Sequence, residues 1–169
     1  GSELITFMLV LFSIGVGTGS LLCNRLLHQQ IDSRFSPFCL LAMSFTLFDL
    51  SHAIRKLHAI AVPDIHLTIT QFASMYLGWR LSMDILLFSL LGGIFIVPLY
   101  TIIQHETKEH LRARMVACNN LISAIFMLSG SVITILLSKL LHFSLVQIIQ
   151  IFVFFNIITA CYLFKILSF

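Results

Sequence analysis

Apolar residues run through this chain in five long stretches separated by polar connections. The stretches cover Leu4–Leu27, Phe38–Ile54, Met83–Gln104, Met115–Leu141 and Phe143–Phe164. A membrane-spanning helix needs about 20 mostly apolar residues, and the second stretch is the shortest of the five. Because the apolar runs are continuous rather than alternating, they predict helices and not the strands of a membrane barrel.

Composition supports a membrane location. Hydrophobic residues make up 59% of the 169 positions and charged residues 10%, whereas soluble domains carry roughly 25% charged residues. A chain of this size cannot bury so much apolar surface from water, because small folds leave much of their area exposed. We therefore predict an all-α, polytopic membrane bundle of about five transmembrane helices, with residues 1–169 forming a single membrane domain.

The sequence contains no recognisable reaction centre. No serine lies in a Gly-x-Ser-x-Gly elbow and no His-x-x-x-x-Asp pair is present, so the chain is not predicted to be an enzyme. The four cysteines have no Cys-x-x-Cys spacing, and the seven histidines show no metal-ligand spacing, so neither a metal nor a cofactor is predicted. The net charge of +3 is scattered, which argues against nucleic acid as a partner.

The connections between the spans differ in character. Asn24–Pro37 is polar, whereas His58–Ser82 is long and mixed. The middle of that second connection, "LTITQFASMYLGW", is too short to span a membrane and is predicted to lie along the interface. His105–Arg114 concentrates charge between two spans, so topology alone can account for its polarity.

Lysine and arginine predict an orientation, because cytoplasmic loops carry an excess of them. The first loop, the charged loop and the C-terminus together hold six: Arg25, Arg34, Lys108, Arg112, Arg114 and Lys165. The opposite side holds four: Arg55, Lys56, Arg80 and Lys139. This bias predicts a multi-pass membrane protein with its N-terminus outside and its C-terminus in the cytoplasm.

Small residues within the spans predict where helices touch. Gly15 and Gly19 form a Gly-x-x-x-Gly pattern, and such residues let helix backbones approach closely in lipid. The sequence also predicts that Gly92-Gly93 breaks the third span and that Ser129–Ser131 breaks the fourth.

Asp49 is the sharpest single feature, because it lies within an apolar run. A carboxylate at membrane depth is costly and should find a partner in the bundle interior. Arg80 is the favoured partner and Arg55 the weaker one. Asp49 then serves either as a substrate or proton site, or as a structural ion pair. Arg80 and Asp84 are also predicted to form an i,i+4 pair at the start of the third span.

Further polar residues lie at or near the membrane edges of the charged loop. They are candidates for contacts along a transport path or, alternatively, for hydrogen bonds between helices. The full set of candidate path residues is Asp49, Arg80, Asp84, Tyr100, Gln104, Asn119 and Asn120.

Four segments with their spacing resemble a known family. "LFSIGVGTGSLLCNRLL", "FDL", "GGIFIVPLYTIIQ" and "RARMVACNN" are similar to the C-terminal half of major facilitator superfamily transporters, in particular the lysophospholipid transporter branch, whose members are also found fused to acyltransferase and acyl–acyl-carrier-protein synthetase domains. The resemblance covers nearly the whole chain. It implies that the five spans are the eighth to twelfth of twelve and that the activity is transport of lysophospholipid across the inner membrane.

The resemblance also implies a cytoplasmic loop motif, which in the superfamily reads Gly-x-x-x-Asp-Arg-x-Gly-Arg-Lys. Gly19 is kept, Cys23 stands at the acidic position, and Arg25 falls one place beyond the basic position. The motif residues are assigned as Gly19, Arg25 and Asp32. The charged loop is expected to exchange ion pairs between transport states through Glu106, Lys108, Glu109, Arg112 and Arg114.

Five helices supply neither two halves of such a transporter nor one complete half. Alternating access rocks one half against the other, so the expected partners are membrane lipid and the N-terminal half of the transporter, in the same chain or as a separate one. The alternative is a membrane interaction or assembly protein that does not transport, or the relic of a split gene.

Overall fold

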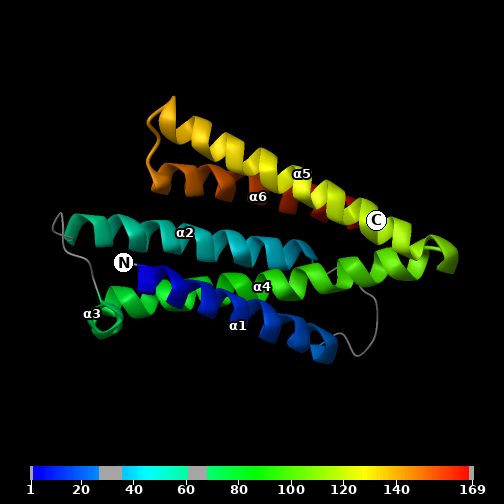
Figure 1. Ribbon diagram of the computed structural model, residues 1–169, viewed down its shortest axis with the longest axis horizontal. Coiled ribbons are helices and arrows are strands. Elements are labelled where there is room, and N and C mark those ends of the chain that lie inside the picture. The colour runs from blue at the N-terminus through cyan, green and yellow to red at the C-terminus, as the bar shows by residue number, and fades with distance from the viewer. Residues whose placement is uncertain (1, 27–35, 61–67, 168–169) are drawn as a thin grey trace.

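The computed structural model describes residues 2–26, 36–60 and 68–167 (Figure 1). Its elements are α1 (Ser2–Leu26), α2 (Ser36–Ile60), α3 (Ile69–Ser74), α4 (Tyr76–Glu106), the 3-10 turn η2 (Glu109–Leu111), α5 (Arg112–Lys139) and α6 (Leu145–Leu167). Five of these helices, all except α3, are long and apolar enough to cross a membrane. For the described residues, the prediction of an all-α protein with about five helices long and apolar enough to span a membrane is confirmed.

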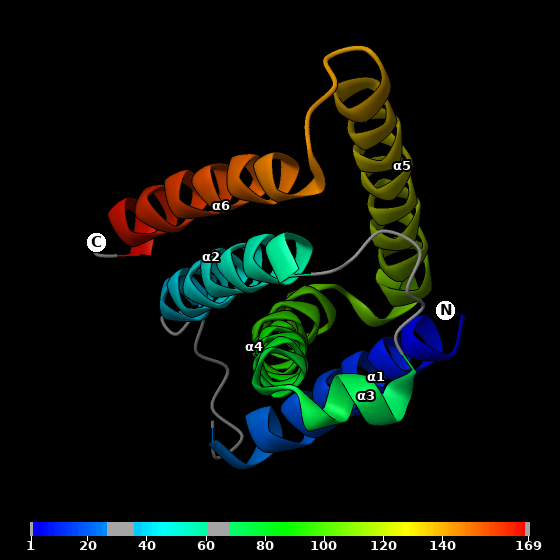
Figure 2. The same cartoon turned by 90° about the vertical axis from the view of Figure 1, so that its left-hand side faces the viewer.

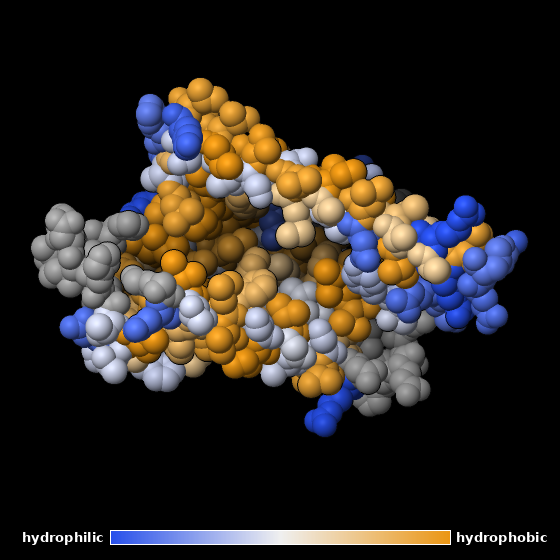
Figure 3. Space-filling model, viewed as in Figure 1, coloured by the Kyte–Doolittle hydropathy of each residue, from blue (hydrophilic) through white to orange (hydrophobic). Residues whose placement is uncertain are grey.

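Helix α4 is the centre of the bundle. It packs along α1 on one side and α2 on the other, and α2 in turn packs on α6. Figure 2 shows α5 standing away from this group. In Figure 3, hydrophilic residues gather at the ends of the molecule and hydrophobic residues form the surface between them. This distribution suits a bundle whose middle lies in hydrocarbon.

Helices α1 and α4 run in the same direction and touch through glycine. A Cβ atom added to Gly93 would lie 2.6 Å from the carbonyl oxygen of Val16 and 2.9 Å from the backbone nitrogen of Ser20. A Cβ atom on Gly19 would likewise meet the backbone of Leu90. The absence of side chains therefore allows the close contact, which confirms the contact face predicted from the Gly15 to Gly19 spacing.

The two predicted helix breaks are wrong. Helix α4 continues through Gly92-Gly93 and Pro98, and α5 continues through Ser129–Ser131. Backbone groups in hydrocarbon have no water to replace a lost hydrogen bond, so glycine alone does not open a helix there. The hydroxyls of Ser129 and Ser131 donate to the carbonyl oxygens four residues earlier, at 2.8 and 2.9 Å, so they stay bound to their own helix.

Two spans are longer than the hydropathy of the sequence predicts. Helix α2 continues to Ile60, and α4 begins at Tyr76 rather than at Met83. The segment predicted to lie along the interface is divided, since part of it forms the short helix α3 and its last residues form the first turn of α4. A capping box at Thr68, in which its backbone nitrogen donates to Gln71, starts α3.

Phe72 of α3 closes one end of the bundle. It is 1% exposed and packs with Ala53 of α2 and Leu81 of α4 in a core that residues of α1 complete. One short helix thus joins three long ones at the level of Asp49 and Arg80.

We expect Gly93→Ala to destabilise the bundle by about 1–3 kcal/mol, the usual cost of overpacking a tight contact. The added methyl group would collide with the backbone of α1. The free energy of unfolding in detergent micelles measures the effect. Gly17→Ala is the matched control, because no atom lies within 4 Å of its Cβ position. Equal stability of the two variants would contradict the proposed contact.

We also expect Phe72→Ala to cost about 3–5 kcal/mol through the cavity it leaves in the core. Phe45→Ala is the matched control, since Phe45 is 73% exposed on α2. The same unfolding measurement checks both variants. A loss at Phe72 no larger than the loss at Phe45 would show that α3 does not hold the helices together.

Candidate functional site

An ion pair joins α2 and α4. The guanidinium of Arg80 donates from Nε to Oδ2 of Asp49 at 3.0 Å, and from Nη2 to Oδ1 in a second short contact. The two side chains are 27% and 31% exposed. The predicted pairing of Asp49 with Arg80 is confirmed, whereas Arg55, the weaker candidate, is exposed.

The geometry follows from the chemistry of the two groups. An acid on an apolar helix needs a partner, and the planar fork of arginine matches both oxygens of a carboxylate. Arg80 lies in the second turn of α4, where the packing of α2 on α4 brings Asp49 within reach. The arrangement fixes both oxygens of Asp49 and leaves part of the Arg80 side chain accessible.

Asp84 lies one turn beyond Arg80 but does not pair with it as predicted. The two guanidinium nitrogens that form charged hydrogen bonds reach Asp49 instead. Asp84 is 7% exposed, and its Oδ2 atom is buried with no hydrogen-bond donor among the described residues. Its carboxyl group interacts electrostatically with both Asp49 and Arg80. Tertiary contact with α2 therefore overrides the local i,i+4 pairing.

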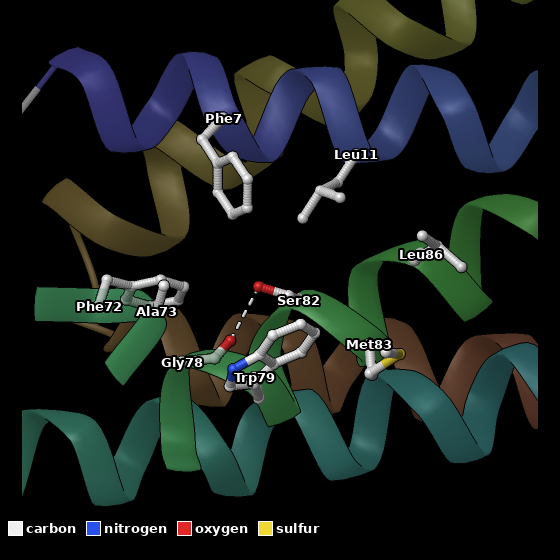
Figure 4. Close-up of a pocket in the computed structure, with 9 residues that line it drawn as sticks. All are labelled: Phe7, Leu11, Phe72, Ala73, Gly78, Trp79, Ser82, Met83 and Leu86. Carbon is white, nitrogen blue, oxygen red and sulfur yellow. Dashed lines mark hydrogen bonds between the residues drawn. The ribbon is translucent and has the colours of Figure 1, made fainter. Parts of the chain in front are cut away.

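A pocket of about 200 Å³ lies between α1, α3 and α4 at the same end of the bundle. Figure 4 shows Phe7 and Leu11 of α1 facing Phe72 of α3 and Trp79 of α4 across it. The hydroxyl of Ser82 donates to the carbonyl oxygen of Gly78 at 2.8 Å, so this polar group is already satisfied. The walls therefore suit an apolar ligand such as an alkyl chain.

This pocket was not predicted from the sequence. Trp79 is the sequence feature that could have indicated the pocket, because it is the single tryptophan and directly precedes Arg80. Its aromatic side chain is equally typical of the membrane interface, and the facing residues of α1 are distant in sequence. Only the packing of α1 on α4 reveals that they enclose a space.

The remaining path candidates form a second group near the other end of α4. The hydroxyl of Tyr100 donates to Oδ1 of Asn120 in α5 at 3.3 Å. Gln104 is exposed and Asn119 is half-buried. At 1.5 Å per residue, Tyr100 lies about 30 Å along α4 from Arg80, which is the thickness of the hydrocarbon core. The structure therefore does not bring the two groups together.

The assigned loop motif is divided by the fold. Gly19 belongs to the contact of α1 with α4, and Arg25 is exposed in the last turn of α1. Asp32 lies outside the described residues. Of the described motif residues, Gly19 therefore contributes to helix packing, and Arg25 contributes to the polar end of α1.

The charged loop is open to solvent. Its predicted gating residues Glu106, Lys108, Glu109, Arg112 and Arg114 are all exposed. Within residues 105–114, the one ion pair formed with a described residue joins Nδ1 of His105 to Oε1 of Glu106 at 3.8 Å. Nε of Arg112 donates to the carbonyl oxygen of Thr107 at 3.4 Å. The exchange of ion pairs in this loop stays a prediction.

Comparison of the chain with protein-family models, with curated proteins and with solved structures finds no match. The resemblance to transporters therefore rests on the quoted sequence segments alone. In the described part of the chain, no three histidine, cysteine, aspartate or glutamate side chains gather as metal ligands would.

We expect Asp49→Ala and Arg80→Ala each to lower the stability of the inserted bundle, because each leaves one partner's charge uncompensated. A charge exchange that combines Asp49→Arg with Arg80→Asp should be more stable than either of its single substitutions. Unfolding in detergent micelles measures all of these variants, with the exposed Arg112→Ala as the control. A double variant no more stable than its parents would show that the pair contributes no coupling.

Proposed function

We propose that this chain is part of a major facilitator transporter that moves lysophospholipid across the inner membrane. The observation that carries the proposal is the Asp49–Arg80 ion pair between two spans. Ionisable residues within membrane spans are costly and mark substrate or ion pathways more often than exposed ones do. The sequence resemblance to the lysophospholipid transporter branch supports the same assignment.

A lysophospholipid combines one alkyl chain with a charged phosphate headgroup, and this end of the bundle offers a counterpart to each. Arg80 is a phosphate-binding side chain by its chemistry and is 27% exposed. The apolar pocket begins at its neighbour Trp79. In this proposal the headgroup competes with Asp49 for Arg80 while the alkyl chain enters the pocket.

We further propose that the chain acts with another bundle of membrane helices, namely the N-terminal half of the transporter, in the same chain or as a separate one. No residue of α5 is buried. The surface is hollowed between α5 and the helices beside it (Figure 3), and a groove of about 450 Å³ is lined by Leu47, Phe88 and Phe152, among others. An incomplete bundle of this kind supports a role as one part of a larger assembly.

We expect uptake of labelled lysophosphatidylethanolamine into spheroplasts when the chain is expressed together with its upstream reading frame, and none with either piece alone. Arg80→Ala should abolish that uptake. Lys139→Ala, at a cation that is exposed at the end of α5, is the control and should retain it.

Absence of uptake with both pieces stably inserted would contradict the proposal. It would favour the alternative, a membrane interaction or assembly protein without transport, or the relic of a split gene. If uptake persists in Arg80→Ala, the proposal of a transporter stands, but Arg80 does not bind the headgroup.

A further inference from the structure

Asp84 is a buried acid with an unsatisfied oxygen. It is 7% exposed, and its Oδ2 atom has no hydrogen-bond donor among the described residues. An ionised carboxylate can only accept hydrogen bonds, and burying one without donors is strongly unfavourable. Such a group avoids the cost by carrying a proton.

The nearest cation is committed elsewhere. Arg80 uses Nε and Nη2 to bind both oxygens of Asp49. With Asp49 and Asp84 both ionised, two negative charges would share one guanidinium between the packed helices α2 and α4. With a proton on Asp84, the three groups together are neutral, which a medium of low dielectric constant favours.

Asp49 is the ionised member of the two acids. Both of its oxygens accept from Arg80, and hydrogen bonds from a cation favour the charged form of a carboxyl group. Oδ2 of Asp84 has no such donor among the described residues, so Asp84 is the acid that carries the proton.

Among the described residues, Asp49 and Arg80 are the charged groups that interact with Asp84. On α2, His52 interacts electrostatically with Asp49, whereas Arg55 and Lys56 are exposed. On α4, Tyr76 interacts electrostatically with Arg80. The charged residues of α1 in the described range, Glu3 and Arg25, lie at its two ends. Helix α3 carries no charged residue, and the basic residue of α6 lies in its last turn.

We propose that Asp84 is a proton-binding site, which holds a hydrogen as a carboxylic acid while Arg80 pairs with Asp49 and releases it when Arg80 turns from Asp49 to Asp84. On release, the O–H bond of Asp84 breaks and the proton passes, directly or through water, to Asp49, which Arg80 has left. The guanidinium then compensates the new carboxylate of Asp84, so the three groups stay neutral. The inference concerns the chain itself and does not require that it transports anything.

A linkage with ligand binding follows. An anion that draws Arg80 away from Asp49 would leave two acids without a cation, so the pair would hold its proton more tightly. Proton binding at Asp84 and anion binding at Arg80 would then strengthen each other. The proposed headgroup phosphate is one such anion.

Infrared spectroscopy of the full chain in vesicles of phosphatidylethanolamine and phosphatidylglycerol tests the proposal. Near neutral pH we expect the carbonyl stretching band of a protonated carboxylic acid, shifted when water is replaced by heavy water. Asp84→Asn should abolish the band. Asp49→Asn should also abolish it, because Arg80 becomes free to pair with Asp84. Glu109→Gln, at an exposed carboxylate of η2, is the control and should retain it.

No such band near neutral pH, or a band that persists in Asp84→Asn, would overturn the proposal. Should Asp84→Asn fail to insert, Asp84→Glu replaces it: a displaced band supports the assignment and an unchanged band overturns it. The band is independent of uptake. A chain that shows the band but no uptake would support the proton site and contradict the transporter. A chain that shows uptake but no band would support the transporter and contradict the proton site.

Discussion

Helices α1 and α4 approach each other through backbone rather than side chains, and the positions of the other elements follow from that contact. Gly93 leaves room for the backbone of Val16 and Ser20, and Gly19 for that of Leu90. In lipid, apolar side chains gain little by leaving their surroundings, so such close packing is what holds helices together. It fixes α1 in register with α4 and allows Phe72 of α3 to close the same end.

The same packing explains why charge is found where it is. Helix α4 has α1 on one side and α2 on the other, so the polar residues of its second and third turns face a neighbouring helix rather than lipid. Arg80 meets Asp49 there, while Asp84, one turn deeper, is enclosed. The difference between an ion pair that is a third exposed and an acid that is nearly buried arises from a single helical turn.

Much of this fold could be predicted from the sequence, for physical reasons that also mark the limits. Long apolar runs predict spans, and a lone acid at depth predicts a partner, so the helices and the Asp49–Arg80 pair could be predicted. The start of α4 at Tyr76 could not be predicted, because its first turns mix aromatic, polar and charged residues as an interfacial segment does. The missing donor at Asp84 and the pocket beside Trp79 depend on which helices meet, and spacing along one helix carries no such information.

Helix α5 differs from the other spans because none of its residues is buried by the described chain. In water, a helix with so many exposed apolar residues would collapse onto its neighbours. In hydrocarbon, that driving force is absent, and the hydroxyls of Ser129 and Ser131 are already bound to their own helix. A side-chain hydrogen bond from Tyr100 of α4 to Asn120 joins α5 to α4 near the charged loop. The far end of α5 therefore depends on α6 and on the surrounding lipid for its position.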